Sequence, residues 1–515
     1  MQTRKVIAVQ GPQIHTARDP LVLRPFRHRR LAAWCTQFIL TLAVGAAQWP
    51  AAAVELPNIG DSSAAVVSAQ QEKELGEAFM REVRRSLTIV DDPQVQEYVS
   101  SIGYRLVAHA DAGSGDFTFF VVQHEAINAF AAPGGFIGIH TGLILASRNE
   151  SELAAVVGHE IAHVTQRHLP RAFEQASQMN IPTAAALLAA LVLGRQNSNI
   201  GEAALATAFA ANQQNRINFT RSNEQEADRI GIDLVARAQF DPNSMATFFE
   251  RLQQTYRFYE GSLPEYLSTH PVTVSRIADA RARADAYPPT APGRESSYPF
   301  IRAKLRVIAA QDKAEVLALF RADLNAESAL ARDEARYGYA LALSTEGDHA
   351  AAREAIAPLL KRDPERLLFI LARAGIESSA REHQTAARIL RDALLLYPDN
   401  YSATMAYSDA LLNLGQAEEA YKLLRELTQK RGHDPAVFKL YARAAGESGR
   451  EIVAHQALAE YYYLLGETAS AVQQLKVAQE KLGKDADKKN FYLASRIDAR
   501  LKEFKTVLTS EDKRN

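Results

Sequence analysis

The stretch His159-Glu160-Ile161-Ala162-His163 decides the expected fold of the amino-terminal half of this chain. Apolar residues precede it at helical spacing over 151–158, and residues 149–151 offer a polar cap, so the stretch is predicted to lie inside a helix. Residues four apart share one helix face, so both imidazoles can bind one metal ion while Glu160 stands beside it. This arrangement is typical of a zinc-dependent peptidase.

A second helix, expected to begin at Ser222 or Asn223, carries residues that can complete the site. Glu224 and Asp228 are again four residues apart, so one carboxylate can bind the metal and the other can hold an imidazole by its second nitrogen. Glu226 competes for the position of third ligand. It projects about 200 degrees around the helix from Glu224, however, and only Glu224 has Asp228 on its own face. A solvated acidic face is the alternative interpretation of the pair.

The composition excludes several classes of protein. The chain has 515 residues, 47% of them apolar and 23% charged, which argues against a collagen-like, low-complexity or wholly disordered chain and favours two or more domains. The formal net charge is -1, so nothing in the total charge favours nucleic acid as a partner. Because Cys35 is the single cysteine, any metal site must use His and carboxylate ligands.

A secretory leader with an amino-terminal extension is expected over residues 1–53. The basic segment 26–30 precedes an uncharged apolar core at 38–47, and Ala51-Ala52-Ala53 fits the small-residue pattern of a cleavage site. We therefore predict cleavage near Ala53, export, and a mildly acidic mature chain without cysteine. An uncleaved membrane anchor is the alternative, which the shortness of the apolar core disfavours.

The carboxyl-terminal half repeats with a period of 34 residues. A linker is expected over 287–300, because its prolines and glycine cannot continue a helix, and it separates a predicted domain at 70–286 from one at 301–505. This period resembles the tetratricopeptide repeat, a helical hairpin that stacks into a solenoid with a concave surface for partners. The recurring turn positions are Gly347, Arg381, Gly415 and Gly449, and the small residues that follow each by five are Ala352, Ala386, Ala420 and Ala454.

The two metal-binding stretches together identify a resemblance. The His-Glu-Ile-Ala-His segment, followed by Asn-Glu-Gln-Glu-Ala-Asp-Arg-Ile-Gly at 223–231, resembles the gluzincin peptidases of the HtpX and CAAX-prenyl-protease type. The resemblance implies an α+β zincin-like metallopeptidase domain, mostly helical with a small sheet, followed by an all-α tetratricopeptide-repeat solenoid. It also implies one zinc ion per chain, bound by His159, His163 and Glu224, with Glu160 as general base and Asp228 orienting a histidine.

With a leader in front and repeats behind, the chain is most similar to periplasmic members of that group. This similarity implies a metalloendopeptidase that hydrolyses misfolded or stalled outer-membrane β-barrel proteins, whose repeats bind substrate or the assembly machinery, with added chaperone-like activity and a possible peripheral membrane contact. A metal-silenced chaperone or scaffold that acts through its repeats is the alternative. A structural zinc domain is disfavoured, because two such helices leave the fourth ligand position open.

Two β-rich runs are expected before the first metal-binding helix. Residues 117–122 form a predicted strand, and 128–142 form a hairpin that turns at 133–135. In the resembled group, the segment that corresponds to Asn128, Ala129 and Phe130 is the edge strand along the metal cleft. The resemblance therefore implies that an extended substrate pairs with these three residues. A core hairpin without substrate contact is the alternative.

Two further histidines and one apolar segment complete the expectations. The resembled group carries a His-Pro pair at the position of His270, which could silence the enzyme at the open metal position or stabilise an oxyanion, unless it is only a loop cap. His168 projects about 180 degrees from His159 and is excluded as a ligand if the helix continues that far. The apolar segment 181–211 is expected to be a buried helix, a lid or a partner surface.

Overall fold

The computed structural model describes residues 68–110, 116–169, 213–256, 265–288, 290, 297–483 and 491–512. These residues fall within one compact unit, Ser62–Asn515. The predicted leader over 1–53 and the apolar segment 181–211 lie outside the described residues, and the predicted linker over 287–300 lies partly outside them. Within the described ranges, no helix combines the length and the apolar character that a membrane span requires.

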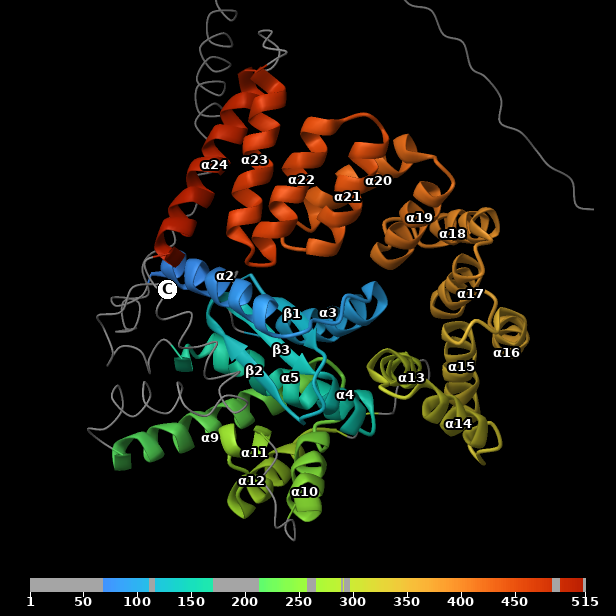
Figure 1. The fold of residues 1–515 in the computed structure, drawn as a ribbon. Helices are drawn as coiled ribbons and strands as arrows, with labels where there is room; N and C mark the ends of the chain where they lie inside the picture. Colours follow the sequence, from blue (N-terminus) through green and yellow to red (C-terminus); the bar gives the residue numbers. More distant parts are fainter. Residues whose placement is uncertain are drawn as a thin grey trace, which may run out of the picture. The chain divides into compact units, whose positions relative to one another are not determined.

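The first half of the described chain is mostly helical and holds one small sheet (Figure 1). In the sheet, β3 lies between the other two strands, parallel to β1 and antiparallel to β2. This confirms the predicted α+β class. The elements are α2 (Ala69–Ser86), α3 (Pro93–Val107), β1 (Thr118–Val122), β2 (Ala129–Ala132), β3 (Phe136–His140), α4 (Thr141–Ala146), α5 (Glu150–Thr165), α9 (Gln213–Arg237), α10 (Ser244–Tyr256), α11 (Glu265–Thr269) and α12 (Val274–Ala284).

The predicted strand and hairpin are both present. The hairpin turns through the short 3-10 helix Pro133–Gly135, where Gly134 and Gly135 take φ values of 73° and 76°. A Cβ atom on Gly135 would lie 2.0 Å from the carbonyl oxygen of Asp116, so this turn requires glycine for space as well as for conformation. Strand β2 is at one edge of the sheet.

Helix α5 passes through the middle of the domain. Its cap is Asn149, one of the three residues that the sequence offered, and its side chain accepts a hydrogen bond from the backbone amide of Glu152 at 2.9 Å. Every residue from Glu152 to Ala162 is buried, so the helix is enclosed on all faces.

Helix α9 packs against α5 at a contact between two glycines. A Cβ atom on Gly158 would lie 3.2 Å from the carbonyl oxygen of Gly231, and a Cβ atom on Gly231 would lie 3.0 Å from the amide nitrogen of His159. Because the two backbones approach so closely, side chains of α5 and α9 can contact one another. The expected start of α9 at Ser222 or Asn223 is wrong: the helix already runs from Gln213, so both residues lie inside it. Capping side chains also occur within helices, which made the boundary ambiguous.

The second half of the described chain consists of helices, stacked as pairs, which confirms the predicted all-α repeat region. At each 34-residue turn position the backbone takes a positive φ, with 86° at Gly347, 62° at Arg381, 75° at Gly415 and 77° at Gly449. The helices are α13 (Tyr298–Ala309), α14 (Lys313–Asp323), α15 (Ala329–Thr345), α16 (His349–Arg362), α17 (Leu367–Ser379), α18 (His383–Leu396), α19 (Tyr401–Asn413), α20 (Ala417–Lys430), α21 (Pro435–Glu447), α22 (Glu451–Leu464), α23 (Thr468–Gly483) and α24 (Phe491–Asp512).

One repeat departs from glycine at the turn, and this gives a testable prediction. We expect Arg381→Gly to raise the free energy of unfolding by about 0.5–1 kcal/mol, because a left-handed conformation costs a non-glycine residue about 1–2 kcal/mol and part of that gain is lost to unfolded-state entropy. Gly415→Ala is the matched control and should lower stability, since open space surrounds its Cβ position and only conformation changes. Urea unfolding of both variants checks this. Equal stability of Arg381→Gly and wild type would contradict it.

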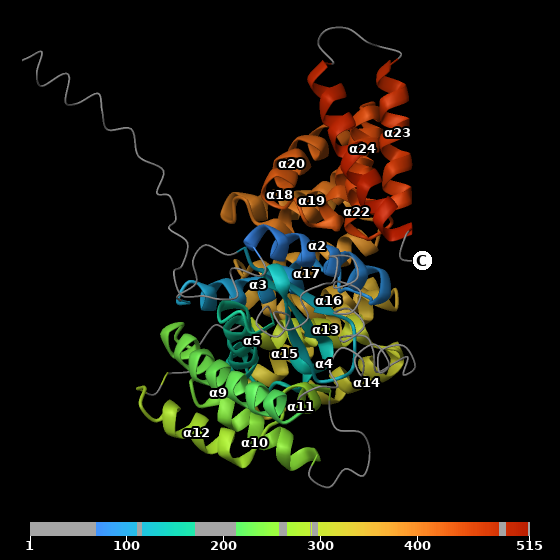
Figure 2. The same ribbon diagram turned by 90° about the vertical axis from the view of Figure 1, so that its left-hand side faces the viewer.

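The repeats curve around α2 and α3, the first two helices that the structure describes (Figures 1 and 2). Arg84 of α2 donates to the carbonyl oxygens of His433 at 3.0 Å and Leu464 at 3.1 Å. On α3, the carboxylate of Glu97 accepts a hydrogen bond from the side-chain amide (Nδ2) of Asn400 at 2.8 Å. Part of the repeat surface that the sequence assigned to partners is therefore covered by α2 and α3 of the same chain.

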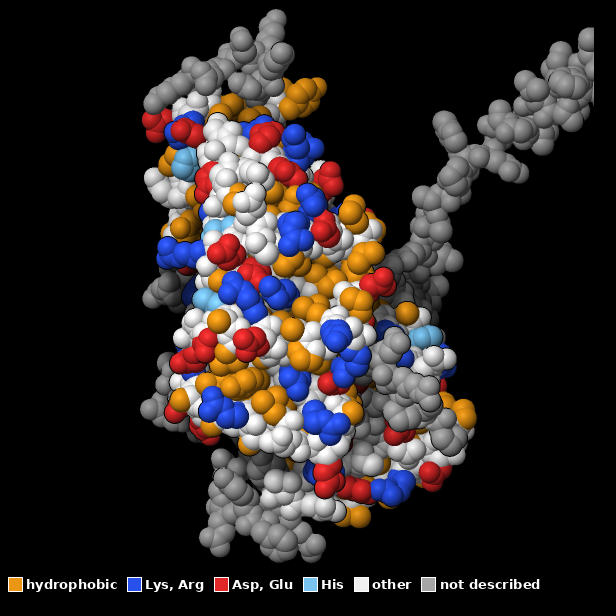
Figure 3. Space-filling model, turned by 90° about the vertical axis from the view of Figure 1, so that its right-hand side faces the viewer, with side chains coloured by type: hydrophobic (Ala, Val, Ile, Leu, Met, Phe, Trp, Pro, Cys, Tyr) orange, Lys and Arg blue, Asp and Glu red, His pale blue; other side chains and the backbone are white. Residues whose placement is uncertain are grey.

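The outer face of the repeats carries a mixed surface. On the side of the molecule that Figure 3 shows, basic and acidic side chains are interspersed with hydrophobic ones. Among the exposed hydrophobic residues are Leu395 and Leu396 at the end of α18.

Candidate metal centre

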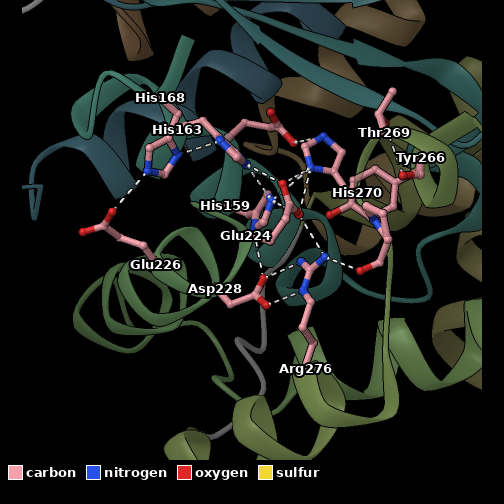
Figure 4. Close-up of polar contacts among 12 residues, drawn as sticks. His159, His163, His168, Glu224, Glu226, Asp228, Tyr266, Thr269, His270 and Arg276 are labelled. Atoms are coloured by element: carbon pink, nitrogen blue, oxygen red, sulfur yellow. Dashed lines mark hydrogen bonds and ion pairs between the residues drawn. The ribbon is translucent and has the colours of Figure 1, made fainter. Parts of the chain in front are cut away.

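Helices α5 and α9, together with the residue that follows α11, bring four potential metal ligands to one point. His159, His163, Glu224 and His270 each offer a ligand atom, and these atoms all lie within 4.8 Å of one another. His159 and His163 come from α5, Glu224 from α9, and His270 from the residue that follows α11 (Figure 4). The structure thus brings together the three predicted ligands and adds His270 to them.

The spacing of these atoms fits a small tetrahedral ion. Donor atoms placed tetrahedrally about 2.0–2.1 Å from one zinc ion lie roughly 3.3 Å apart. Nε2 of His159 lies 3.0 Å from Nε2 of His163 and 3.3 Å from Nδ1 of His270. Oε1 of Glu224 lies 3.4 Å from Nε2 of His163 and 3.1 Å from Nδ1 of His270. The imidazole and carboxylate donors also match the ligand types that zinc prefers.

A buried ion-pair network, formed by Asp228 of α9 and Arg276 of α12, supports these ligands. Nδ1 of His159 lies 3.0 Å from Oδ1 of Asp228, the contact that the sequence predicted for this carboxylate. Arg276 of α12 donates to Asp228 through Nε at 2.7 Å and Nη2 at 2.8 Å. Nη1 of the same guanidinium lies 2.9 Å from Oε2 of Glu224. Arg276 therefore fixes both carboxylates at once.

These contacts control the charge of the cluster. Burial alone would lower the pKa of His159, but the carboxylates of Asp228 and Glu224 outweigh it and raise the pKa to about 10. Burial would raise the pKa of Glu224, and the neighbouring histidines instead hold it well below its usual range. The cluster is thus a negatively charged carboxylate beside a protonated imidazole. A cation that binds here takes the place of that proton.

Glu160 is available for proton transfer next to the cluster. It is 1% exposed, and its Oε1 forms no hydrogen bond with any described residue. This oxygen lies 3.6 Å from Nε2 of His270. A buried carboxylate with an unused oxygen is positioned to accept a proton from a molecule that enters the site.

His270 is held in the cluster by its own segment. Its ring stacks on Tyr266, with centroids 4.9 Å apart and an interplanar angle of 30°. The amide of Tyr266 in turn donates to the carbonyl oxygen of Ile127 at 3.2 Å, which ties α11 to the segment just before β2. With His270 in place, four protein side chains offer ligand atoms to the centre.

His168 and Glu226, which the sequence excluded as metal ligands, lie next to the centre. Helix α5 ends at Thr165, and Arg167 takes a φ of 52°, so the assumption behind the helical position of His168 fails. His168 is 4% exposed, and its Nδ1 lies 2.8 Å from Nδ1 of His163. Glu226 lies outside the four-residue cluster, and its Oε2 is 3.3 Å from Nε2 of His168.

The side chains of the segment that the resemblance assigned to substrate pairing are buried. Asn128, Ala129 and Phe130 are 3%, 1% and 8% exposed. Ala129 and Phe130 begin the edge strand β2, which packs against α5. Any pairing with substrate would therefore use backbone groups of this strand rather than its side chains.

Arg276 is the residue that the sequence analysis missed. It shares one face of α12 with Ala280 and Ala284, and all three are buried. A charged residue in a buried helical stripe indicates a paired charge, so this periodicity is the signal that could have identified it. Tyr266 was also missed, and no comparable pattern distinguishes it.

A helix pair that gathers His-Glu-x-x-His and Glu-x-x-x-Asp around one buried centre defines a metallopeptidase. Comparison with known families agrees with this class. The model of Peptidase family M48 matches residues 93–284, and a tetratricopeptide repeat model matches residues 379–444.

Individual relatives extend the match over most of the chain. The β-barrel assembly-enhancing protease of Escherichia coli K12 is 35% identical over 441 residues, covering 83% of this chain and 88% of the relative. That of Yersinia pestis is 33% identical over 427 residues, with the same coverage of each chain. The mitochondrial metalloendopeptidase OMA1 of Schizosaccharomyces pombe is 34% identical over 185 residues, which is 35% of this chain and 50% of the relative. The chain belongs to peptidase family M48, in the group of the β-barrel assembly-enhancing proteases, and it is a metalloprotease.

Proposed function

We propose that this metalloprotease is a zinc endopeptidase that cleaves misfolded or stalled outer-membrane β-barrel proteins in the periplasm. The observation that carries the proposal is the buried set of His159, His163 and Glu224, whose spacing fits zinc. The names of the bacterial relatives support the substrate class, and the leader expected over 1–53 supports export. The repeats would bind substrate or the assembly machinery.

In the proposed mechanism, the chain's own residues hold the ion and move protons. Bound zinc would polarise the substrate carbonyl and make water a better nucleophile. His159, His163 and Glu224 would hold the ion, while the carboxylate of Asp228 would accept a hydrogen bond from Nδ1–H of His159 and so fix its ring. Glu160 would take a proton from the attacking water and pass it to the nitrogen of the leaving amine.

The proposed role of His270 is to close the site. Its Nδ1 lies 3.3 Å from Nε2 of His159 and 3.1 Å from Oε1 of Glu224, so with an ion bound it would take the position that water and substrate need. A closed set of four ligands is also what a structural zinc site shows, but membership of a peptidase family argues that the closure is reversible. The resting enzyme would then be silent until the segment that carries His270 moves away.

The alternative function is a chaperone or scaffold that acts mainly through the repeats while the metal site stays closed. The observation that favours it is the presence of His270 among the four residues whose ligand atoms lie within 4.8 Å of one another. Both functions can reside in one chain, because the repeats and the metal centre are separate parts of the structure.

The proposed substrate class is tested with one outer-membrane β-barrel protein in two states. We expect the purified mature chain to cleave the barrel unfolded in dilute urea and to leave the same barrel intact after folding into detergent micelles, because only the unfolded chain can lie extended along the edge strand. Gel analysis over time measures both rates, with a chelator as the control for metal dependence. Equal cleavage of both states would contradict the proposed substrate.

The role of Asp228 is tested by Asp228→Asn. We expect zinc affinity to fall about 10–100-fold, because the ring of His159 loses its carboxylate partner. Asp233→Asn is the matched control on the same helix, where the carboxylate pairs with Arg237 near the surface, and it should bind zinc as wild type does. Competition with a chelator of known affinity measures both. Unchanged affinity in Asp228→Asn would contradict the assigned role.

A further inference from the structure

A second chain of polar contacts leads away from the metal centre, through residues that the mechanism does not use. Beyond His163 lies His168, and beyond His168 lies Glu226 (Figure 4). The contacts are 2.8 Å between the two Nδ1 atoms and 3.3 Å from Nε2 of His168 to Oε2 of Glu226. His168 is 4% exposed, whereas the side chain of Glu226 is 33% exposed.

When a metal is bound, these contacts allow only one tautomer for the neutral ring of His163 and one for that of His168. Nε2 of His163 faces the other ligands, so a bound ion would use that nitrogen and leave the proton of the neutral ring on Nδ1. Nδ1 of His163 then donates to Nδ1 of His168, which must accept. The proton of His168 therefore sits on Nε2, where it points at the carboxylate of Glu226.

We propose that His168 and Glu226 are positioning residues that hold His163 in its ligating orientation through this donor chain. The inference rests on the proposed zinc site. It gives His163 the kind of outer support that Asp228 gives His159, since a metal-binding imidazole nearly always donates its second N–H to a fixed acceptor. The two histidines of α5 are thus supported from different sides, His159 by α9 and α12 together and His163 by the turn after its own helix.

The backbone after α5 is shaped for this contact. A helix that continued past Thr165 would carry His168 away from the metal face. Helix α5 ends instead at Thr165, Arg167 takes a left-handed conformation with a φ of 52°, and His168 lies beside Glu226 of α9. Such a conformation is unfavourable for a side chain other than glycine or asparagine, so the turn has a conformational cost that the contact of His168 helps to offset.

The test measures zinc affinity in the full mature chain, by competition with a chelator of known affinity. We expect His168→Phe, which keeps a ring of similar size without an acceptor, to weaken zinc binding about 10–100-fold. His168→Asn can still place an acceptor near Nδ1 of His163, so it should retain most of the affinity. His140→Phe is the matched control, because His140 is another buried histidine, 3% exposed, that lies outside the cluster.

A double-mutant cycle tests whether Glu226 acts on His163 only through His168. Glu226→Gln alone should weaken zinc binding by less than tenfold, since this side chain is partly solvated. Because Glu226 acts only through His168, the double variant His168→Phe with Glu226→Gln should bind zinc as His168→Phe does. Additive losses would overturn the proposed order.

Folding is checked separately, by the melting temperature of the metal-free variants. A purely structural role for His168 would lower the metal-free melting temperature and leave zinc affinity unchanged, which would overturn the inference. If His168→Phe does not fold, Glu226→Gln still decides, because affinity equal to wild type would overturn it. A wild-type chain that binds no zinc would instead contradict the proposed function itself, so the two failures are distinguishable.

Discussion

Glu160→Gln is expected to keep about one zinc per chain and to lower kcat/KM for peptide hydrolysis by a factor of about 10²–10⁴. The substitution preserves the shape of the side chain and removes the carboxylate that accepts the proton of the attacking water. The structure explains why zinc should remain, because Glu160 lies outside the four-residue ligand cluster. Metal analysis and cleavage of an unfolded protein, performed on the same sample, measure both quantities.

Glu150→Gln is the control for this change. Glu150 is in the first turn of the same helix, where it accepts a hydrogen bond from Tyr98, far along α5 from the metal-binding residues. It should therefore retain both zinc and activity. Equal proteolysis by Glu160→Gln and wild type would show that the proton passes through another group, and loss of zinc in Glu160→Gln would show that this carboxylate is a ligand.

His270→Ala is expected to raise the resting rate of cleavage, by about tenfold if the open form is a tenth of the population. The physical reason is the placement of His270 Nδ1 within 3.1–3.3 Å of two other donors, where it blocks the position that substrate needs. Removing this side chain leaves His159, His163 and Glu224, which are enough for a catalytic zinc site. Initial rates with an unfolded substrate measure the effect.

The sign of this change separates the two roles that the sequence left open. A residue that stabilises the oxyanion would instead lower kcat by about 10²–10³-fold when removed. Zinc content provides the check, since a lower rate with about one zinc retained would establish the oxyanion role. An unchanged rate would contradict both roles and leave His270 as a loop residue.

Much of the fold was predictable because it depends on local patterns. The 34-residue step predicted turns at Gly347 and Gly415, since each hairpin requires the same backbone reversal, and the structure shows that both take a positive φ. The same step placed Arg381 at an equivalent turn, although its side chain gives no such indication. The packing of the repeats against α2 and α3 was not predictable, because contacts such as Arg84 with His433 join residues far apart in sequence.

In the candidate site, too, the residues set by local spacing were predictable, and those set by contacts between distant segments were not. Spacing alone identified Glu224 and Asp228, because residues four apart on a helix necessarily share a face. The argument that excluded His168 used the same rule and assumed that α5 continued, but the helix ends at Thr165. Arg276 has no fixed spacing from either motif, and only the packing of α12 against α9 brings it to Asp228.

The most direct test of the central claim is the metal content of the purified mature chain, measured by elemental analysis together with its proteolytic rate. The account predicts about one zinc per chain, loss of both zinc and cleavage in Glu224→Ala, and recovery of cleavage when zinc is returned to chelated wild type. A chain that cleaves unfolded protein at full rate without metal, or a Glu224→Ala variant that binds zinc as wild type does, would contradict it.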